Sequence, residues 1–242
     1  MKGYAKPLHE FIEGHKIQFV IPVYQRNYDW LIDNCDQLFS DLVKLSRSNR
    51  CSHFFGSIVT SSADSSYNRL VIDGQQRLTT ISLLLLAGIK AVKDGAIEIS
   101  EESKIDEAYE VFLKAKFCNS ERKIKLVPID NDRIAYDKIF NEEDSFDEDS
   151  KVTRNYRHFY DLLTRKPQAL SFDQLLDAIE RLQIISIELD SDDDAQLIFE
   201  SLNSTGLALT EADKIRNYLL MSLTSEEQHM CFKNYWQKIE QA

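Results

Sequence analysis

The run VIDGQQRLTTISLLLLAGIKAVKDG, residues 71–95, has the clearest structural pattern in this chain. It opens with a β-rich segment that ends at Asp73-Gly74, a pair typical of turns. Strong helix formers follow and continue to Asp94-Gly95. Because apolar residues cover nearly the whole circumference of this segment, it predicts a helix that is buried on most sides. A strand, a glycine turn and a buried helix therefore form the predicted centre of the molecule.

The spacing of apolar residues predicts further strands and helices around this centre. Strands are expected at 17–22, 53–61, 67–73, 124–129 and 182–189, with 53–61 and 67–73 forming a hairpin. Helices are expected at 30–46, 103–116, 152–165, 171–182 and 210–223. Three more are expected: one that is capped by Asp130 or Asp132 and ends near Phe140, one that ends near Asn203, and one that begins at about 225. With only seven Gly and four Pro among 242 residues, helix should exceed strand. The predicted fold class is α+β, a small mixed sheet with helices followed by a mainly helical second half.

The acidic segment NEEDSFDEDS, residues 141–150, separates the two predicted halves. It has six acidic residues and no aliphatic residue, so we expect a solvated loop. The prediction is a core at 1–140 and a mainly helical part at 151–242, packed on the core as one continuous unit.

The composition excludes several classes of protein. No apolar run approaches the ~20 residues that span a bilayer, and no export signal is visible, so we expect a cytoplasmic protein without membrane contact. The four cysteines lie far apart and no His or Cys spacing matches a metal site, so neither a zinc site nor a disulfide framework is expected. A net charge of −11 argues against bulk coating of nucleic acid. The candidate patch for a local DNA contact is Arg154, Arg157 and Arg165.

The strongest chemical signal lies in VIDGQQRLTT, residues 71–80. Gly74 allows a ligand to approach the backbone, and the amides of the first helical turn, at Gln76, Arg77 and Leu78, favour an anion. Arg77 adds a forked cation that matches phosphate oxygens. Further polar groups come from Gln75, Gln76, Thr79 and Thr80. The alternative is a plain strand-to-helix connection in which Asp73 caps the helix.

The second signal is IPVYQRNYDW, residues 21–30. A loop with aromatic and polar residues can stack a base and hold a phosphate. Tyr24, Gln25 and Arg26 are the candidates for a pocket wall. In the alternative, Tyr28 and Trp30 are core anchors and Arg26 pairs with an acid.

The third signal is FESLNSTGLALTEADKIRNYLL, residues 199–220. Asn203 and Gly206 favour a left-handed exit from one helix, and Thr210 with Asp213 favours a capped start of the next. The pattern is compatible with a helix–turn–helix that reads DNA. Because the second helix is not strongly basic, a structural pair of helices is the preferred interpretation.

Together these segments resemble the DUF262 family, the GmrSD-type N-terminal domain related to the ParB/sulfiredoxin fold. The matching pieces are IPVYQRNYDW (21–30), FFGSIV (54–59), VIDGQQRLTTISLLLL (71–86) and FESLNSTGLALTEADKIRNYLL (199–220). They span most of the chain in the family's order. The sulfiredoxins use a cysteine near the equivalent turn, and this chain has none there, so redox chemistry does not carry over.

The resemblance implies a nucleotide-dependent sensor in a bacterial restriction system that attacks modified phage DNA. Asp73 and Arg77 are then expected to be catalytic, with a nucleoside triphosphate and Mg²⁺ as cofactors. Gly56 and Ser57 join the nucleotide-binding residues through the matching FFGSIV piece. Expected partners are foreign or modified DNA, an HNH-type nuclease domain or subunit outside residues 1–242, and a second copy of the chain. The alternative function is a non-catalytic scaffold that docks DNA or the nuclease.

Overall fold

The computed structural model describes residues 1–48, 50–62, 67–118, 123–165, 170–190, 192–203, 210–221 and 223–240. Strands in this part of the chain are β1 (Lys2–Pro7), β2 (Gln18–Val20), β3 (His53–Ser62), β4 (Asn68–Asp73), β5 (Leu126–Val127) and β6 (Leu182–Leu189). The helices are α1 (Leu8–Ile12), α2 (Ile32–Arg47), α3 (Gln75–Lys93), α4 (Ser103–Ala108), α5 (Asp130–Phe140), α6 (Lys151–Thr164), α7 (Phe172–Glu180), α8 (Ala195–Asn203), α9 (Glu211–Leu220), α10 (Ser225–Cys231) and α11 (Gln237–Glu240). Two π-helical turns, η1 (Tyr109–Leu113) and η2 (Phe232–Trp236), continue α4 and α10. None of these helices is long and apolar enough to cross a membrane.

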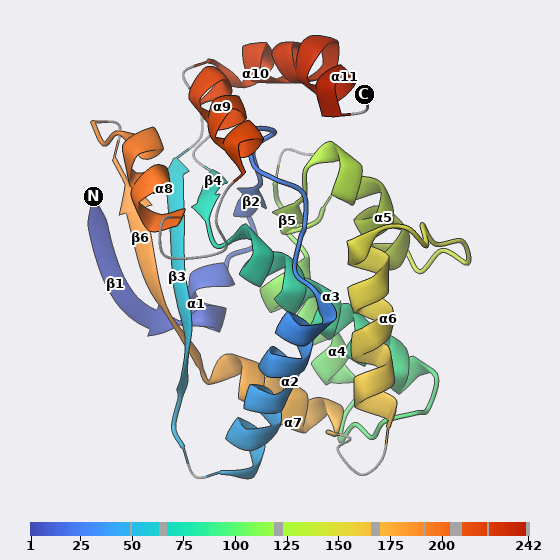
Figure 1. Cartoon of the computed structure of the whole chain (residues 1–242). Coiled ribbons are helices and arrows are strands. Elements are labelled where there is room, and N and C mark those ends of the chain that lie inside the picture. Colours follow the sequence, from blue (N-terminus) through green and yellow to red (C-terminus); the bar gives the residue numbers. More distant parts are fainter. Residues whose placement is uncertain are drawn as a thin grey trace.

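The six strands form one mixed sheet in the order β1-β6-β3-β4-β2-β5. Strands β4, β2 and β5 run parallel to one another, while β3 and β4 form the predicted antiparallel hairpin. Strand β6 is parallel to β3 and antiparallel to β1. The sheet makes up one side of the molecule, and α2, α3, α5, α6 and α7 gather on the other (Figure 1). The fold is thus α+β, as predicted, and β6 brings the second half of the chain into the middle of the sheet.

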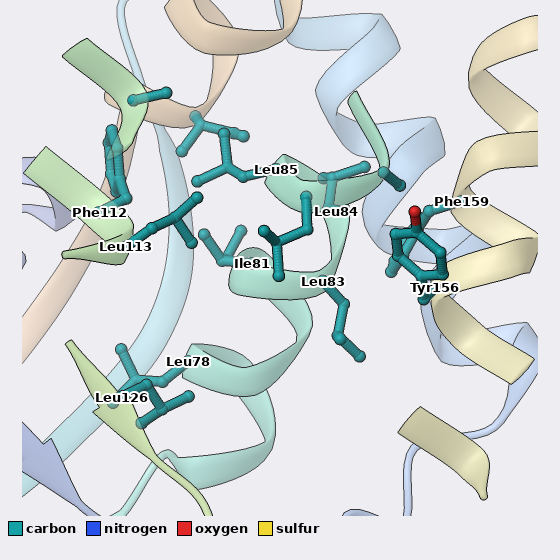
Figure 2. Packing of buried hydrophobic residues seen from close by; sticks show 14 of the residues in the cluster. Leu78, Ile81, Leu83, Leu84, Leu85, Phe112, Leu113, Leu126, Tyr156 and Phe159 are labelled. Atoms are coloured by element: carbon teal, nitrogen blue, oxygen red, sulfur yellow. The ribbon is translucent and has the colours of Figure 1, made fainter. Parts of the chain in front are cut away.

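Helix α3 is the centre of the larger core. Fifteen of its 19 residues are buried, which confirms the prediction from its uniform apolar pattern. Figure 2 shows Ile81 and Leu85 of α3 near Phe112 and Leu113 of η1, with Tyr156 and Phe159 of α6 nearby. Burial of this apolar surface fixes the direction in which the first turn of α3 points.

The two faces of the sheet are covered differently. Ile58 of β3 and Val71 of β4 face the large helical core. Their neighbours Val59 and Ile72 face the opposite side, where Phe199 of α8 packs on them. Alternation along each strand therefore feeds two separate apolar clusters. A third, small cluster joins α9 and α10 to the loop after β2 through Val23, Tyr24, Leu220 and Phe232.

Most predicted elements are present with small shifts of their ends. The capping box of Ser171 and Gln174 is present at α7, and that of Thr210 and Asp213 at α9. The acidic segment 141–150 is mainly exposed, as expected, although Phe146 packs against the ring of Tyr156.

Four expectations about local structure are wrong. Strand β5 is shorter than 124–129, because Pro128 has no amide to continue the ladder. The helix predicted at 103–116 ends as a π-helical turn at Leu113. Ile129, and neither Asp130 nor Asp132, is the N-cap of α5. The sequence analysis also missed β1, since KGYAKP has the Gly and Pro that strands usually lack and depends on pairing with β6.

Candidate functional site

The site is built where β4 ends and α3 begins. Gly74 is the N-cap of α3 and has a φ of +94°, a conformation that L side chains rarely adopt. A Cβ at this position would lie 2.9 Å from Cγ1 of Ile58 and 3.2 Å from the carbonyl oxygen of Ser57. The glycine is therefore required by both backbone angle and space.

The first turn of α3 presents unpaired backbone donors. The amide of Leu78 donates to the carbonyl of Gly74 at 3.1 Å and closes the first helical turn. In the described part of the chain, the amides of Gln75, Gln76 and Arg77 have no such acceptor. Because the helix dipole adds partial positive charge here, this end of α3 favours an anion. Leu78 was wrongly included among the free amides, since its own helical bond is already made.

Arg77, in the first turn of α3, contacts β3 beyond the end of β4. Its Nη1 donates to the carbonyl oxygen of Ser57 at 3.1 Å and lies 3.8 Å from Oδ2 of Asp73. The guanidinium lies directly over Gly56, where a Cβ would be only 2.6 Å from Nε. Gly56 has a φ of +122° at a bulge in β3. The arginine side chain is still 32% exposed, so a ligand can reach part of it from solvent.

Asp73 is the acidic group of the site. Burial raises its pKa, and Arg77 opposes that shift; the amide of Gly74, the charge of Arg26 and Ser57 also lower it. Its side chain is 23% exposed, so one edge of the carboxyl group can be reached from solvent. Asp73 does not cap α3, because no side chain caps that helix.

Three glutamines tie the loop after β2 to the strand–turn–helix segment. Gln25 Nε2 donates to the carbonyl of Ile72 at 2.8 Å, and Gln75 Nε2 donates to that of Arg26 at 3.2 Å. Gln76 accepts from the amides of Asp29 (2.8 Å) and Trp30 (3.3 Å) and donates to the carbonyl of Asn27 (3.2 Å). The side chains of all three glutamines are buried. The two motifs, 21–30 and 71–80, therefore form one interlocked unit.

The other candidates in the loop 21–30 and in α3 lie at different depths. Arg26 is 17% exposed and lies 4.0 Å from Asp29. Its charge also lowers the pKa of Asp73. Tyr24 is buried in the small cluster under α9 and α10, and burial raises its pKa. As anticipated in the alternative interpretation, Tyr28 is a core anchor.

The two threonines are buried in α3. The Thr80 hydroxyl donates to the carbonyl of Gln76 at 2.7 Å and is 2.8 Å from the hydroxyl of Tyr28. Asn155 of α6 donates to the same tyrosine hydroxyl at 2.9 Å. Thr79 is 2% exposed. These hydroxyls thus lie behind the first turn of α3, within the packed interior.

The third motif lies partly outside the described residues. Asn203 is the last residue of α8, its side chain is not described, and Gly206 falls outside the described ranges. Asp213 accepts from the Thr210 amide at 3.0 Å and pairs with Arg216 at 3.0 Å. Its visible role is to cap α9.

The predicted basic patch on α6 is matched by acids. Arg154 lies 3.9 Å from Asp149, and Arg157 lies 2.6 Å from Glu148. Arg165 pairs with Asp161 at 3.1 Å. The segment 141–150 thus supplies two of the three partners and reduces the positive field of α6.

The sequence analysis missed two partners within the site. One is the carbonyl oxygen of Ser57, which no sequence pattern could reveal because every residue has one. The other is Asp132, which accepts from the amide of Tyr28 at 2.6 Å, and burial raises its pKa to about 6. The sequence pattern had suggested Asp132, or Asp130, only as a helix cap.

One family model matches the chain, and it covers the three motifs described above. Residues 8–220 match the family described as GmrSD restriction endonuclease, N-terminal domain. None of the curated proteins compared with the chain matches it. Since the family match spans far more than half of the chain and includes the interlocked motifs, this chain belongs to the GmrSD N-terminal domain family of restriction systems.

Proposed function

We propose that the junction of β4 and α3 binds the phosphates of a nucleoside triphosphate. The observation that carries the proposal is the placement of Arg77, whose guanidinium lies over Gly56 beside the unpaired amides of Gln75 to Arg77. A partly exposed arginine and a helix N-terminus aimed at one place recognise phosphate by charge and by directed hydrogen bonds. Arg26, on the adjoining loop, is a second cation near the same carboxylate.

Asp73 and Ser57 fit the expected Mg²⁺. Magnesium in nucleotide sites is usually held by one or two carboxylates together with phosphate oxygens. Asp73 supplies a partly exposed carboxylate, and the hydroxyl of Ser57 is a neighbouring oxygen donor. Three or more metal-ligating side chains do not cluster among the described residues, so the phosphates would complete the coordination. When bound, the ion neutralises charge on the phosphates.

Hydrolysis follows from the same groups. A water attacks the terminal phosphorus, and the bond to the bridging oxygen breaks, releasing a nucleoside diphosphate and inorganic phosphate. Arg77 stabilises the negative charge on the phosphoryl oxygens, and Asp73 orients the water or the ion. In the whole system this module acts as the nucleotide-dependent sensor of modified foreign DNA, and the DNA-cleaving activity belongs to a nuclease domain or subunit.

A scaffold function is the second candidate, and the glutamines favour it. Gln25, Gln75 and Gln76 use their amides on the protein's own backbone. A motif that is occupied in this way can be purely architectural, with the domain docking DNA or a nuclease. The two functions differ in whether Arg77 meets a ligand.

Calorimetric titration with nucleoside triphosphates and Mg²⁺ tests the proposal. An Arg77→Ala variant loses charge-assisted contacts worth roughly 1.5–3 kcal/mol each, so affinity should fall at least tenfold. Arg165→Ala is the matched control, because Arg165 is exposed and, within the described residues, its ion pair is with Asp161 of the preceding helix. Circular dichroism verifies that both variants fold.

The outcomes separate the two functions. Loss of affinity in Arg77→Ala alone supports the phosphate site, and loss of phosphate release in a folded Asp73→Asn variant supports hydrolysis. Equal affinity in wild type and Arg77→Ala would refute the role of Arg77. No binding by the wild type would favour the scaffold.

A further inference from the structure

Among the residues that the structure describes, one face of the sheet is only partly covered. Helix α8 lies over the upper part of β3 and β6 in Figure 1, where Phe199 packs on Val59 and Leu189. Below α8, no helix of the described chain lies over the same face of β3, β6 and β1 in Figure 1. This uncovered part borders the end of β4, where the phosphate site lies.

The bulge in β3 places an aromatic ring on that open face. Phe54 pairs with Gln183 and Gly56 pairs with Ile184, so Phe55 is the extra residue of the bulge. Phe55 packs against the large core, whereas Phe54 remains 60% exposed. The same glycine bulge that makes room for Arg77 therefore also turns Phe54 outward.

Strand register places Phe54 in a row with two other side chains. Register pairs Phe54 with Gln183 and Gln183 with Pro7, so these three side chains form one row across the strands. The next row consists of Ser57, Ile185 and Ala5, and Ile185 is 41% exposed. An aromatic ring and an apolar side chain thus lie beside small neighbours.

Gln183 adds hydrogen-bonding capacity to the row. In the described part of the chain its side-chain amide takes part in no hydrogen bond, unlike those of Gln25, Gln75 and Gln76. A glutamine amide offers one donor and one acceptor side by side, the pattern that matches adjacent polar groups on the edge of a base. The row therefore combines a stacking surface with a group that can read a base.

The row lies close to the phosphate site. Ser57, whose carbonyl accepts from Arg77, lies one row further along the sheet than Phe54. Because the bulge residue adds no register position, this is two residues of the partner strand, roughly 7 Å at 3.3 Å per residue. A ligand with phosphates at Arg77 and a base further along β3 would span both places. A cavity of about 320 Å³ lined by Val20, Leu70 and Val127 is less suitable for the base. Along β4, the hydrogen bond between Gln25 and Ile72 lies between that cavity and Asp73.

We propose that Phe54 stacks on the heterocyclic base of the nucleotide and that Gln183 bonds to the edge of that base. This inference rests on the proposed phosphate site and extends it to the nucleoside. The ligand class is a purine or pyrimidine nucleoside triphosphate, and inorganic triphosphate would use only the Arg77 end.

Parallel titrations with ATP, GTP, CTP and UTP and with inorganic triphosphate, all with Mg²⁺, separate the two ends of the site. Phe54→Ala should weaken binding of the preferred nucleotide by about tenfold, the order that base–aromatic stacking contributes, and leave inorganic triphosphate unaffected. Arg77→Ala should weaken both ligands. Phe54→Trp should restore nucleotide affinity, and Gln183→Leu should reduce the preference among the four bases. Phe117→Ala is the matched control, since Phe117 is 63% exposed and its ring contacts His15.

Each failure has a distinct meaning. If Phe54→Ala binds the nucleotide as tightly as the wild type, the base subsite is refuted and the phosphate site stands. Tight binding of inorganic triphosphate without any nucleotide binding also refutes the subsite. If the wild type binds neither ligand, the proposed function itself fails. Sedimentation analysis tests whether this face instead binds a second copy of the chain. A wild-type dimer that dissociates in Phe54→Ala, with unchanged nucleotide affinity, would assign the face to self-association and refute the base subsite.

Discussion

Replacing Gln76 by alanine tests whether the glutamine pair of the turn holds the fold together. The Gln76 side chain makes three hydrogen bonds to the loop after β2, with Asn27, Asp29 and Trp30, and Gln76 is only 8% exposed. Alanine would leave the amides of Asp29 and Trp30 without their acceptor. It would also free the carbonyl of Asn27, which water can reach because that residue is exposed.

The expected loss follows from these groups. Each partly buried amide left unsatisfied costs about 1 kcal/mol or more, and the lost packing of the side chain adds to this. The free energy of unfolding should therefore fall by about 2–3 kcal/mol. For a chain of this length, that corresponds to a melting temperature lower by roughly 5–10 °C.

Urea titration followed by circular dichroism measures the change. The midpoint should fall at constant slope, since the surface exposed on unfolding is unchanged. Gln37→Ala is the control. Its amide donates to Asp41 on the exposed face of α2, and its effect should stay within about 0.5 kcal/mol. A Gln76→Ala variant with wild-type stability would refute the structural role, and if it also lost nucleotide binding, Gln76 would be a ligand contact.

Three further substitutions probe the surroundings of the site. Gly56→Ala should destabilise the protein by about 1–3 kcal/mol because Gly56 has a positive φ. It should also lower nucleotide affinity as much as Arg77→Ala does, because the new Cβ displaces the Arg77 guanidinium. A further loss of affinity in the double variant would contradict this explanation. Asp132→Asn should stabilise the protein by about 2 kcal/mol at pH 7.5 in urea titrations. Because burial raises the pKa of Asp132 in the folded protein to about 6, the wild type loses stability as pH rises from about 4 through 6. The stability difference between variant and wild type should therefore vanish below pH 4. Lys125→Met should lower the urea midpoint, because the buried ammonium donates to three backbone carbonyls that methionine would leave unpaired; an unchanged midpoint would show that those bonds contribute little.

The local elements of the site could be predicted from the sequence. Residues 71–95 have one pattern that fits only a strand, a glycine turn and a buried helix, and the structure has them at β4, Gly74 and α3. The capping boxes at Ser171 and Thr210 were also readable, because each depends on contacts within four residues. The predicted boundary near 141–150 and the ligand roles of the site residues stay predictions.

The tertiary structure alone decided which of the candidate residues meet. The motif at 21–30 could not be placed against 71–80 from spacing, because the glutamines of the two motifs bond to backbone atoms that are about 50 residues away in the chain. The contact of Arg77 with Gly56 and Ser57 depends on where β4 stops beside β3, and the strand β1 exists only because β6 lies beside it. Apolar pattern and helix caps are local properties of a sequence, whereas hydrogen bonds to backbone atoms and strand register depend on packing between distant segments, which one sequence does not reveal.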